Sequence, residues 1–288
     1  MRLTGPRRTA VLAAVMRCLA SARHDRCCGP DGPGTGMLRG MALTVHTFAQ
    51  RPDLAGRGVP SADVWPEYSL HGDVLNLYWG PLVSELPEFQ LVLYDDESDT
   101  VLGELHTGPL SWDGDDAHLS SGIDVAVRDV VDGRRAGHPV DTLCALAAEI
   151  SPVAQGRGLS EQALRAMAAL AATHGLRHLL APVRPSWKER YPLTPIEEYV
   201  QWRRPDGCPL DPWLRVHERV GGRIAAPLPR SMLITGAVAE WETWVGMAFP
   251  RTGEYVFPHG LALLDVDVDV DLGTYWEPNV WVVHPVPS

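Results

Sequence analysis

An apolar run, a glycine-containing turn and a helical pattern follow one another in the middle of this chain. Leu143–Ile150 carries one charged side chain, Glu149, and this composition is typical of a strand near the centre of a sheet. Glu161–Thr173 carries apolar side chains at helical spacing, and Leu176–Val183 forms a second apolar run. A strand–turn–helix–strand unit buries its apolar faces when helices cover a sheet, so we expect an α/β fold.

The turn between the first strand and the helix reads Gln155-Gly156-Arg157-Gly158-Leu159-Ser160. Its two glycines allow the main chain to approach a ligand closely, and the first N–H groups of the following helix lack partners within the helix. Such a turn binds phosphate or pyrophosphate groups and predicts a nucleotide-like cofactor. An ordinary loop remains the alternative, because a short Gly-x-Gly before a helix is common.

Two standard phosphate-binding motifs do not fit the turn. The Lys-Ser/Thr pair of a P-loop is missing, and the only lysine of the chain, Lys188, lies far downstream. The dinucleotide motif needs a third glycine and an acidic residue at the end of the next strand, where this chain has Arg184-Pro185.

The segment resembles the acetyl-CoA-binding segment of the GNAT N-acyltransferase superfamily, whose signature is Arg/Gln-x-x-Gly-x-Gly/Ala between a strand and a long helix. Gln155, Gly158 and Ser160 occupy the three defined positions, and Ser160 departs from Gly/Ala while remaining small. The resemblance covers roughly residues 43–236. It implies a mixed, mostly antiparallel central sheet flanked by helices, with residues 237–288 as a C-terminal extension.

The resemblance also implies an activity, the transfer of an acyl group from a CoA thioester to the amine of a small molecule in a ternary complex. Acetyl-CoA is the expected donor, and another acyl-CoA is the alternative. The amides of the turn from Gln155 to Ser160 would hold the pyrophosphate. The main chain from Ala148 to Ile150 would place the thioester and stabilise the oxyanion. Ser186 is the candidate for a contact with pantetheine.

Glu149 is the candidate general base. Strand alternation turns its side chain to the face opposite Ala148 and Ile150, where the superfamily binds the acceptor. A carboxylate on an otherwise apolar strand is costly to bury, and a base with a raised pKa would explain its presence. The alternative is a structural glutamate that bonds to a neighbouring arginine or to loop amides.

His217 is the candidate acid for the departing thiolate. The superfamily often has a tyrosine in a pattern like Tyr-Glu-Lys-x-Gly-Phe, and the matching stretch here begins His217-Glu218-Arg219. An imidazolium donates a proton near neutral pH, so His217 would replace the tyrosine. A structural histidine within the helix is the alternative.

Composition and charge narrow the classes of partner. The chain has 288 residues, 45% of them hydrophobic, and a formal net charge of −11. An acidic protein is unsuited to nucleic acid and suits a small, cationic acceptor, although acidic surfaces also serve solubility. No apolar run reaches the roughly 20 residues that a membrane helix needs. The cysteines and histidines form no zinc motif, so no metal is expected.

Cysteine usage and the N-terminal segment bear on location and domain limits. Five scattered cysteines fit reduced thiols in a cytoplasmic protein better than a disulfide framework. We interpret residues 1–40 as a disordered or spurious leader and residues 41–288 as the acyltransferase domain. A homodimer is a further expectation. Two other functions stay open: a relative that uses a longer acyl donor or another thioester chemistry, and a non-catalytic CoA-binding sensor or partner module.

Overall fold

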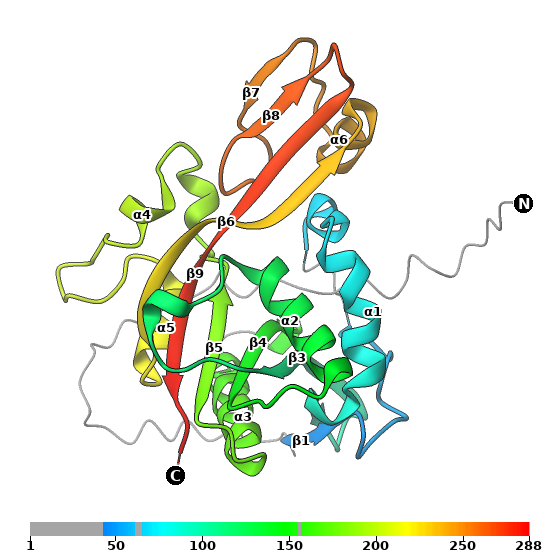
Figure 1. Cartoon of the computed structure of the whole chain (residues 1–288), viewed down its shortest axis with the longest axis vertical. Coiled ribbons are helices and arrows are strands. Elements are labelled where there is room, and N and C mark those ends of the chain that lie inside the picture. Colours follow the sequence, from blue (N-terminus) through cyan, green and yellow to red (C-terminus); the bar gives the residue numbers. More distant parts are fainter. Residues whose placement is uncertain (1–42, 61–64, 155–156, 288) are drawn as a thin grey trace, which may run out of the picture.

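One mixed sheet organises the protein. The computed structural model describes residues 43–60, 65–154 and 157–287, and the predicted leader of residues 1–40 lies outside them. Nine strands in these ranges have the order β1-β2-β3-β4-β5-β9-β8-β7, with β6 paired to β9 (Figure 1). The strands are β1 (Leu43–Thr47), β2 (Gln90–Asp95), β3 (Thr100–Leu110), β4 (Thr142–Ile150), β5 (His178–Val183), β6 (Arg223–Gly236), β7 (Gly253–Tyr255), β8 (Leu264–Asp267) and β9 (Leu272–Pro285).

The pairing confirms the predicted fold class. Among the strands of the described ranges, β4 and β5 form the one parallel pair, and the other neighbours are antiparallel. A parallel pair needs a crossover connection, and the predicted helix supplies it between β4 and β5. The predicted extension of residues 237–288 contains β9, which pairs with β5.

Helices cover both faces of the sheet. The α-helices of the described ranges are α1 (Leu75–Glu85), α2 (Ile123–Ala136), α3 (Leu159–Thr173), α4 (Ile196–Tyr199), α5 (Pro212–Arg219) and α6 (Val238–Val245). Helices α1 and α2 pack side by side on one face, and α3 lies on the other (Figure 1). A Cβ atom at Gly108 of β3 would lie 2.2 Å from Val130 of α2, so this glycine allows the helix to approach the strand.

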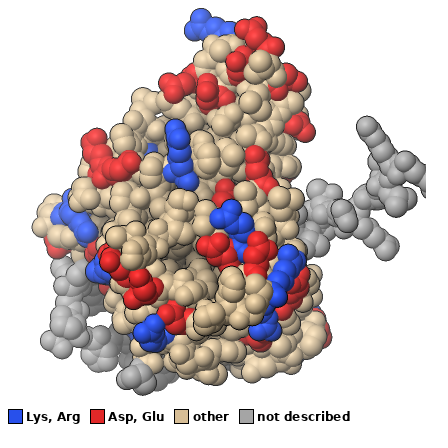
Figure 2. Space-filling view, viewed as in Figure 1, with Lys and Arg blue, Asp and Glu red and all other residues tan. Residues whose placement is uncertain are grey.

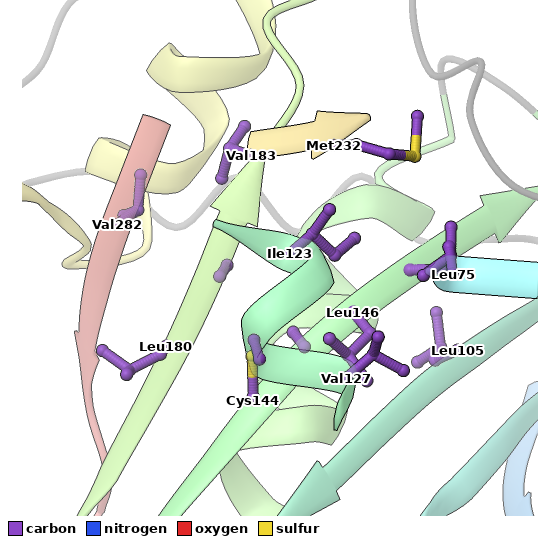
Figure 3. Close-up of a cluster of buried hydrophobic side chains, with 14 of the residues drawn as sticks. Leu75, Leu105, Ile123, Val127, Cys144, Leu146, Leu180, Val183, Met232 and Val282 are labelled. Atoms are coloured by element: carbon purple, nitrogen blue, oxygen red, sulfur yellow. The ribbon is translucent and has the colours of Figure 1, made fainter. Parts of the chain in front are cut away.

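The core lies between α2 and the central strands. Figure 3 shows Val127 of α2 beside Leu146 of β4, and Ile123, Cys144 and Leu180 belong to the same buried cluster. These side chains are almost fully buried. Each large aliphatic side chain buried in this way contributes about 1.5–3 kcal/mol, so the packing holds β4 firmly against α2.

An arm extends from one end of the sheet. It consists of β7, β8, α6 and the adjoining halves of β6 and β9, and acidic side chains gather on it (Figures 1 and 2). Trp241 of α6 is fully buried and lies against Tyr68 of the 3₁₀ helix η1 (Glu67–His71) and Tyr275 of β9. These aromatic contacts join the arm to the segment that precedes α1.

The pair Asp211-Pro212 predicts a helix start, because aspartate is a common N-cap and proline fits the first turn, and α5 begins there. The Asp211 side chain accepts hydrogen bonds from the N–H groups of Trp213 and Leu214, and Pro212 is the first helical residue. An aspartate cap of this kind stabilises a helix by about 1 kcal/mol.

Two expectations from the sequence are wrong. Thr47 is a possible helix cap, and the sequence therefore predicts a helix over Thr47–Leu54, but the residues after β1 form consecutive turns. Pro52 lacks an N–H donor and disfavours a helical conformation at the residue before it, which ends any helix there. Cys208 takes part in a disulfide, contrary to the expected reduced state, whereas Cys144 is a buried free thiol.

Candidate active site

Strands β4 and β5 separate along their length. Pairing between them covers only Thr142–Cys144 and His178–Leu180, although β4 continues to Ile150 and β5 to Val183. The second half of β4 therefore has β3 on one side and, among the strands that the structure describes, no partner on the other. A β-bulge at this point of the β3–β4 ladder accompanies the separation. Main-chain groups along the open side of β4 are available to a ligand.

The main-chain groups of Ala148 and Ile150 face this open side. The N–H of Ser151 donates to Leu102 of β3, so the odd-numbered residues at this end of β4 direct their N–H and C=O groups towards β3. Strand alternation directs those of Ala148 and Ile150 the other way. Ala148 is also the one residue of β4 that is not fully buried. The two residues lie where the sequence analysis expected thioester contacts.

The glycine turn follows the open end of β4 directly. Gly158 precedes α3 and has a left-handed conformation with a φ of 77°, which favours glycine at this position. A Cβ atom there would meet nothing within 4 Å, so the space above the turn is open. Arg157 and Gly158 are exposed, Leu159 is buried and Ser160 is partly buried. The predicted contacts Gln155 and Gly156 lie outside the described residues.

The start of α3 is suited to an anion. The helix begins at Leu159, and its N-cap, Gly158, offers no side chain to accept from the first N–H groups. The partial positive charge of a helix N-terminus stabilises phosphate groups. Because the turn adjoins the separated strands, the phosphates and the acyl arm of one CoA molecule would lie along a continuous path.

Glu149 is fully buried on the α1–α2 side of the sheet. Glu149 lies opposite Glu104 of β3. His106, two residues after Glu104 on the same strand, packs its ring against Trp79 of α1. Burial, and secondly the charge of Glu104, raises the pKa of Glu149 to about 9. Oε1 of Glu149 accepts a hydrogen bond of 3.4 Å from the Trp65 indole N–H, and Oε2 has no hydrogen-bond partner in the described part of the chain.

A cleft lies beside this carboxyl group, between the start of α1, the start of α2 and strands β6 and β9. It holds about 480 Å³ of empty space, part of which is open to solvent. We call it the Trp65 cleft, and its lining residues are Trp65, Ser69, Leu70, Leu75, Asn76, Trp79, Ile123, Met232, Glu277 and Asn279. Trp65 therefore both lines the cleft and donates to Glu149.

The structure does not bring His217 and Glu149 together. Nδ1 of His217 lies 2.8 Å from Nε2 of His284, which pairs with Leu179 near the start of β5. Leu179 is level with Leu143, six residues before Glu149 on β4. At about 3.3 Å per residue, His217 is displaced by about 20 Å along the strand direction.

The protonation state of His217 also disfavours an acid role. The side chain is buried, and burial together with the charge of His284 holds the pKa of His217 well below its usual value. The imidazole is therefore neutral near pH 7, and its role as acid gains no support from this geometry.

Ser186 follows β5 and lies at the entrance to α5. Its hydroxyl is 3.4 Å from Asp211 Oδ1, and the neighbouring Trp187 N–H also donates to this carboxylate. The side chain therefore helps to join β5 to the capped end of α5, and the predicted pantetheine contact stays a prediction.

The sequence analysis missed several buried polar residues near the cleft. Glu104 and His106 are two residues apart on β3, and an i, i+2 spacing on an apolar strand indicates that both side chains share a face. Arg184 forms a buried ion pair of 2.9 Å with Glu277, and no local pattern could have shown that these residues meet. Tyr68 also donates to Glu277 Oε2.

Other kinds of site find no support in the described ranges. No group of three or more His, Cys, Asp or Glu side chains there is arranged to hold a metal ion. No helix in the same ranges is both long and apolar enough to cross a bilayer.

Comparisons with known proteins place this geometry in context. No protein-family model matches the chain. The chain is 29% identical to the arginine N-acetyltransferase avaD of Aspergillus versicolor, over 90% of this chain and 99% of that protein. The loading GNATL domain of CurA from Lyngbya majuscula superposes with a TM-score of 0.52 and 17% identity, over 85% of this chain and 98% of that domain. The second likeness concerns the fold alone.

Proposed function

We propose, from the premise that this chain is an acyltransferase of the GNAT superfamily, that it transfers an acetyl group from acetyl-CoA to a nitrogen of a small cationic molecule. The observation that carries the proposal is the open side of β4. It joins three parts of one reaction centre: the free main-chain groups of Ala148 and Ile150, the buried carboxyl of Glu149, and the turn at Gly158.

The donor would lie along the open side of β4. Main-chain groups of Ala148 and Ile150 would bind the arm that carries the thioester, since strand edges offer unpaired N–H and C=O groups. Amides of Arg157 to Ser160 at the start of α3 would hold the pyrophosphate, with Gln155 and Gly156 as predicted partners. An N–H group on the open side is also suited to stabilise the oxyanion that forms on the thioester carbonyl.

Glu149 would act as the general base. It takes a proton from the acceptor ammonium, and the neutral nitrogen then attacks the carbonyl carbon of the thioester. Collapse of the tetrahedral intermediate breaks the C–S bond, and the thiolate takes up the proton that the attacking nitrogen loses as the amide forms. A base with a pKa near 9 is matched to an amine, because its proton affinity is closer to that of the amine than an ordinary carboxylate's.

The acceptor would be cationic. Three buried carboxyl groups lie at or near the Trp65 cleft without a lysine or arginine ion pair in the described ranges: Glu104, Glu149 and Asp124, which follows the lining residue Ile123. A cation on the ligand would offset their charge. The similarity to an arginine N-acetyltransferase makes arginine the first acceptor to test.

The direct test is the release of free CoA thiol from acetyl-CoA with a panel of acceptors. We expect turnover with arginine, little with its uncharged isostere citrulline, and a 10²- to 10⁴-fold loss of kcat/KM in Glu149→Gln. Glu97→Gln, at an exposed glutamate, is the matched control. Saturable acetyl-CoA binding without turnover on any amine would favour a CoA-binding sensor, and faster turnover with longer acyl-CoAs would reassign the donor. The predicted homodimer needs a separate measurement of mass in solution.

A further inference from the structure

Glu104 and Glu149 lie opposite each other on neighbouring antiparallel strands. Side chains in such a pair have Cβ atoms about 4.5–5.5 Å apart, so the two carboxyl groups are close neighbours on one face of the sheet. Both are buried, with 6% and 0% of their surface exposed. Neither forms an ion pair with a lysine or arginine in the part of the chain that the structure describes.

Hydrogen bonds do not neutralise the pair. Glu149 receives the indole N–H of Trp65 at 3.4 Å, and Glu104 receives the main-chain N–H of Gly58. One oxygen of each carboxyl, Oε1 of Glu104 and Oε2 of Glu149, has no hydrogen-bond partner within residues 43–60, 65–154 and 157–287. Each group thus has one N–H donor and one unused oxygen.

Among the described residues, the other titratable group beside the pair is His106 of β3, and it supplies no positive charge. Its Nε2 lies 3.8 Å from Glu104 Oε2, and its Nδ1 lies 3.1 Å from Gln90 Oε1. The amide nitrogen of Gln90 donates to three main-chain carbonyls, which orients its oxygen towards His106 and places the imidazole proton on Nδ1. Burial lowers the pKa of His106 to about 4, and Trp79 of α1 covers the ring with an aromatic surface.

Two adjacent buried carboxyl groups without a cation cannot both be ionised at low cost. We propose that Glu104 and Glu149 hold one proton jointly while the Trp65 cleft is empty, and release it when the cationic nitrogen of the acceptor binds between them and the cleft. Glu104 is then a positioning residue that controls when Glu149 becomes a carboxylate. This inference rests on the proposed function, because it takes the acceptor to be a cation.

The exchange balances. The empty pair carries one proton and one negative charge. Binding of the cationic acceptor releases that proton to solvent and leaves two carboxylates beside one cation. Glu149 then takes one proton from the acceptor ammonium, and this returns the pair to its starting state with one proton. The nitrogen forms its bond to the acyl carbon, and its second proton goes to the departing thiolate as the C–S bond breaks. One turnover therefore releases one proton to solvent, at the step in which the acceptor binds.

Infrared titration of the protein without acceptor tests the shared proton. A protonated carboxyl has a carbonyl band distinct from that of a carboxylate, and we expect this band in the wild-type protein at pH 7.5. In Glu104→Gln the midpoint of its titration should fall by at least one pH unit, a tenfold change in the acid constant, because the neighbouring charge is gone. Glu97→Gln, at an exposed site, should leave the midpoint unchanged.

The pH dependence of kcat/KM with arginine is the second readout. We expect the acidic limb of the profile to move down by a similar amount in Glu104→Gln while the plateau at high pH stays within about threefold of wild type. A uniform loss at every pH would indicate a structural role and would refute the proposal. Glu104→Leu offers a second neutral variant if the glutamine variant does not fold.

The infrared and kinetic results separate this inference from the proposed function. Absence of a protonated carboxyl in the wild-type protein at pH 7.5, or an unchanged midpoint in Glu104→Gln, would overturn the shared proton even if the enzyme is active. Wild-type activity in Glu149→Gln would instead remove the proposed base.

Discussion

Replacing Glu149 by glutamine should stabilise the protein while abolishing its activity. The ordinary pKa of a glutamate is 4.5, and burial with the charge of Glu104 raises the pKa of Glu149 to about 9. Between these two values the folded protein holds a proton that the unfolded chain has released. The free energy of unfolding contributed by this group is therefore highest below pH 4.5 and falls as pH rises towards 9.

The magnitude follows from the linkage relation. One proton of difference changes the free energy of unfolding by 1.36 kcal/mol per pH unit. Between pH 5 and pH 8 the wild-type protein should therefore lose up to about 4 kcal/mol relative to Glu149→Gln, which carries a neutral amide of the same shape at every pH. The free energy of unfolding of the variant minus that of the wild type should be about 3 kcal/mol larger at pH 7 than at pH 5. For a domain of this size, that corresponds to roughly 6–12 °C in Tm.

Urea unfolding of both proteins at pH 5, 6, 7 and 8 provides the measurement. Subtracting the two free energies at each pH cancels every other titrating group, and the difference should rise steadily with pH. Glu97→Gln, at an exposed glutamate, should show no such trend. A difference that stays flat from pH 5 to pH 8 would refute the argument, because it would mean that Glu149 is ionised in the folded protein.

Three further variants test the donor turn, the histidine pair and the buried ion pair. Gly158→Ala should lower the affinity for acetyl-CoA about tenfold in calorimetry and the free energy of unfolding by about 1 kcal/mol, because the alanine must adopt a left-handed φ. An unchanged affinity would show that the turn does not bind the cofactor. His217→Ala should lower stability by about 1–3 kcal/mol through loss of its contact with His284 and change kcat less than threefold, whereas a lost basic limb in the pH profile would restore the acid role. Arg184→Met should lower the free energy of unfolding in urea by about 3–5 kcal/mol, since it leaves the Glu277 carboxylate buried without its ion-pair partner. A decrease below 1 kcal/mol would contradict a stabilising role of this ion pair.

The central unit of the fold was predictable because its signals are local. Continuous apolar runs identified β4 and β5, helical spacing identified α3, and Asp211-Pro212 marked the start of α5. The turn at Gly158 was recognisable for the same reason, since a left-handed residue before a helix depends on adjacent residues alone. Glu149 was identified as the one charged residue on an apolar strand.

The pairing of distant segments was not predictable from local signals. Arg184 and Glu277 form an ion pair across 93 positions of sequence, and Trp65 donates to Glu149 across 84. His217 matched the family pattern by position, yet the fold places it beside His284 and away from Glu149. No spacing rule specifies such contacts, because they depend on how the strands are ordered in the sheet.

The chain alone therefore determined its central strand, the turn that follows it and the carboxyl group that this strand carries. Only the tertiary structure decided that β3 lies beside β4 with Glu104 opposite Glu149, and that β5 diverges to open one side of the strand. The physical reason is that backbone preference acts over a few residues, whereas desolvation and charge–charge repulsion depend on which groups the completed sheet brings together.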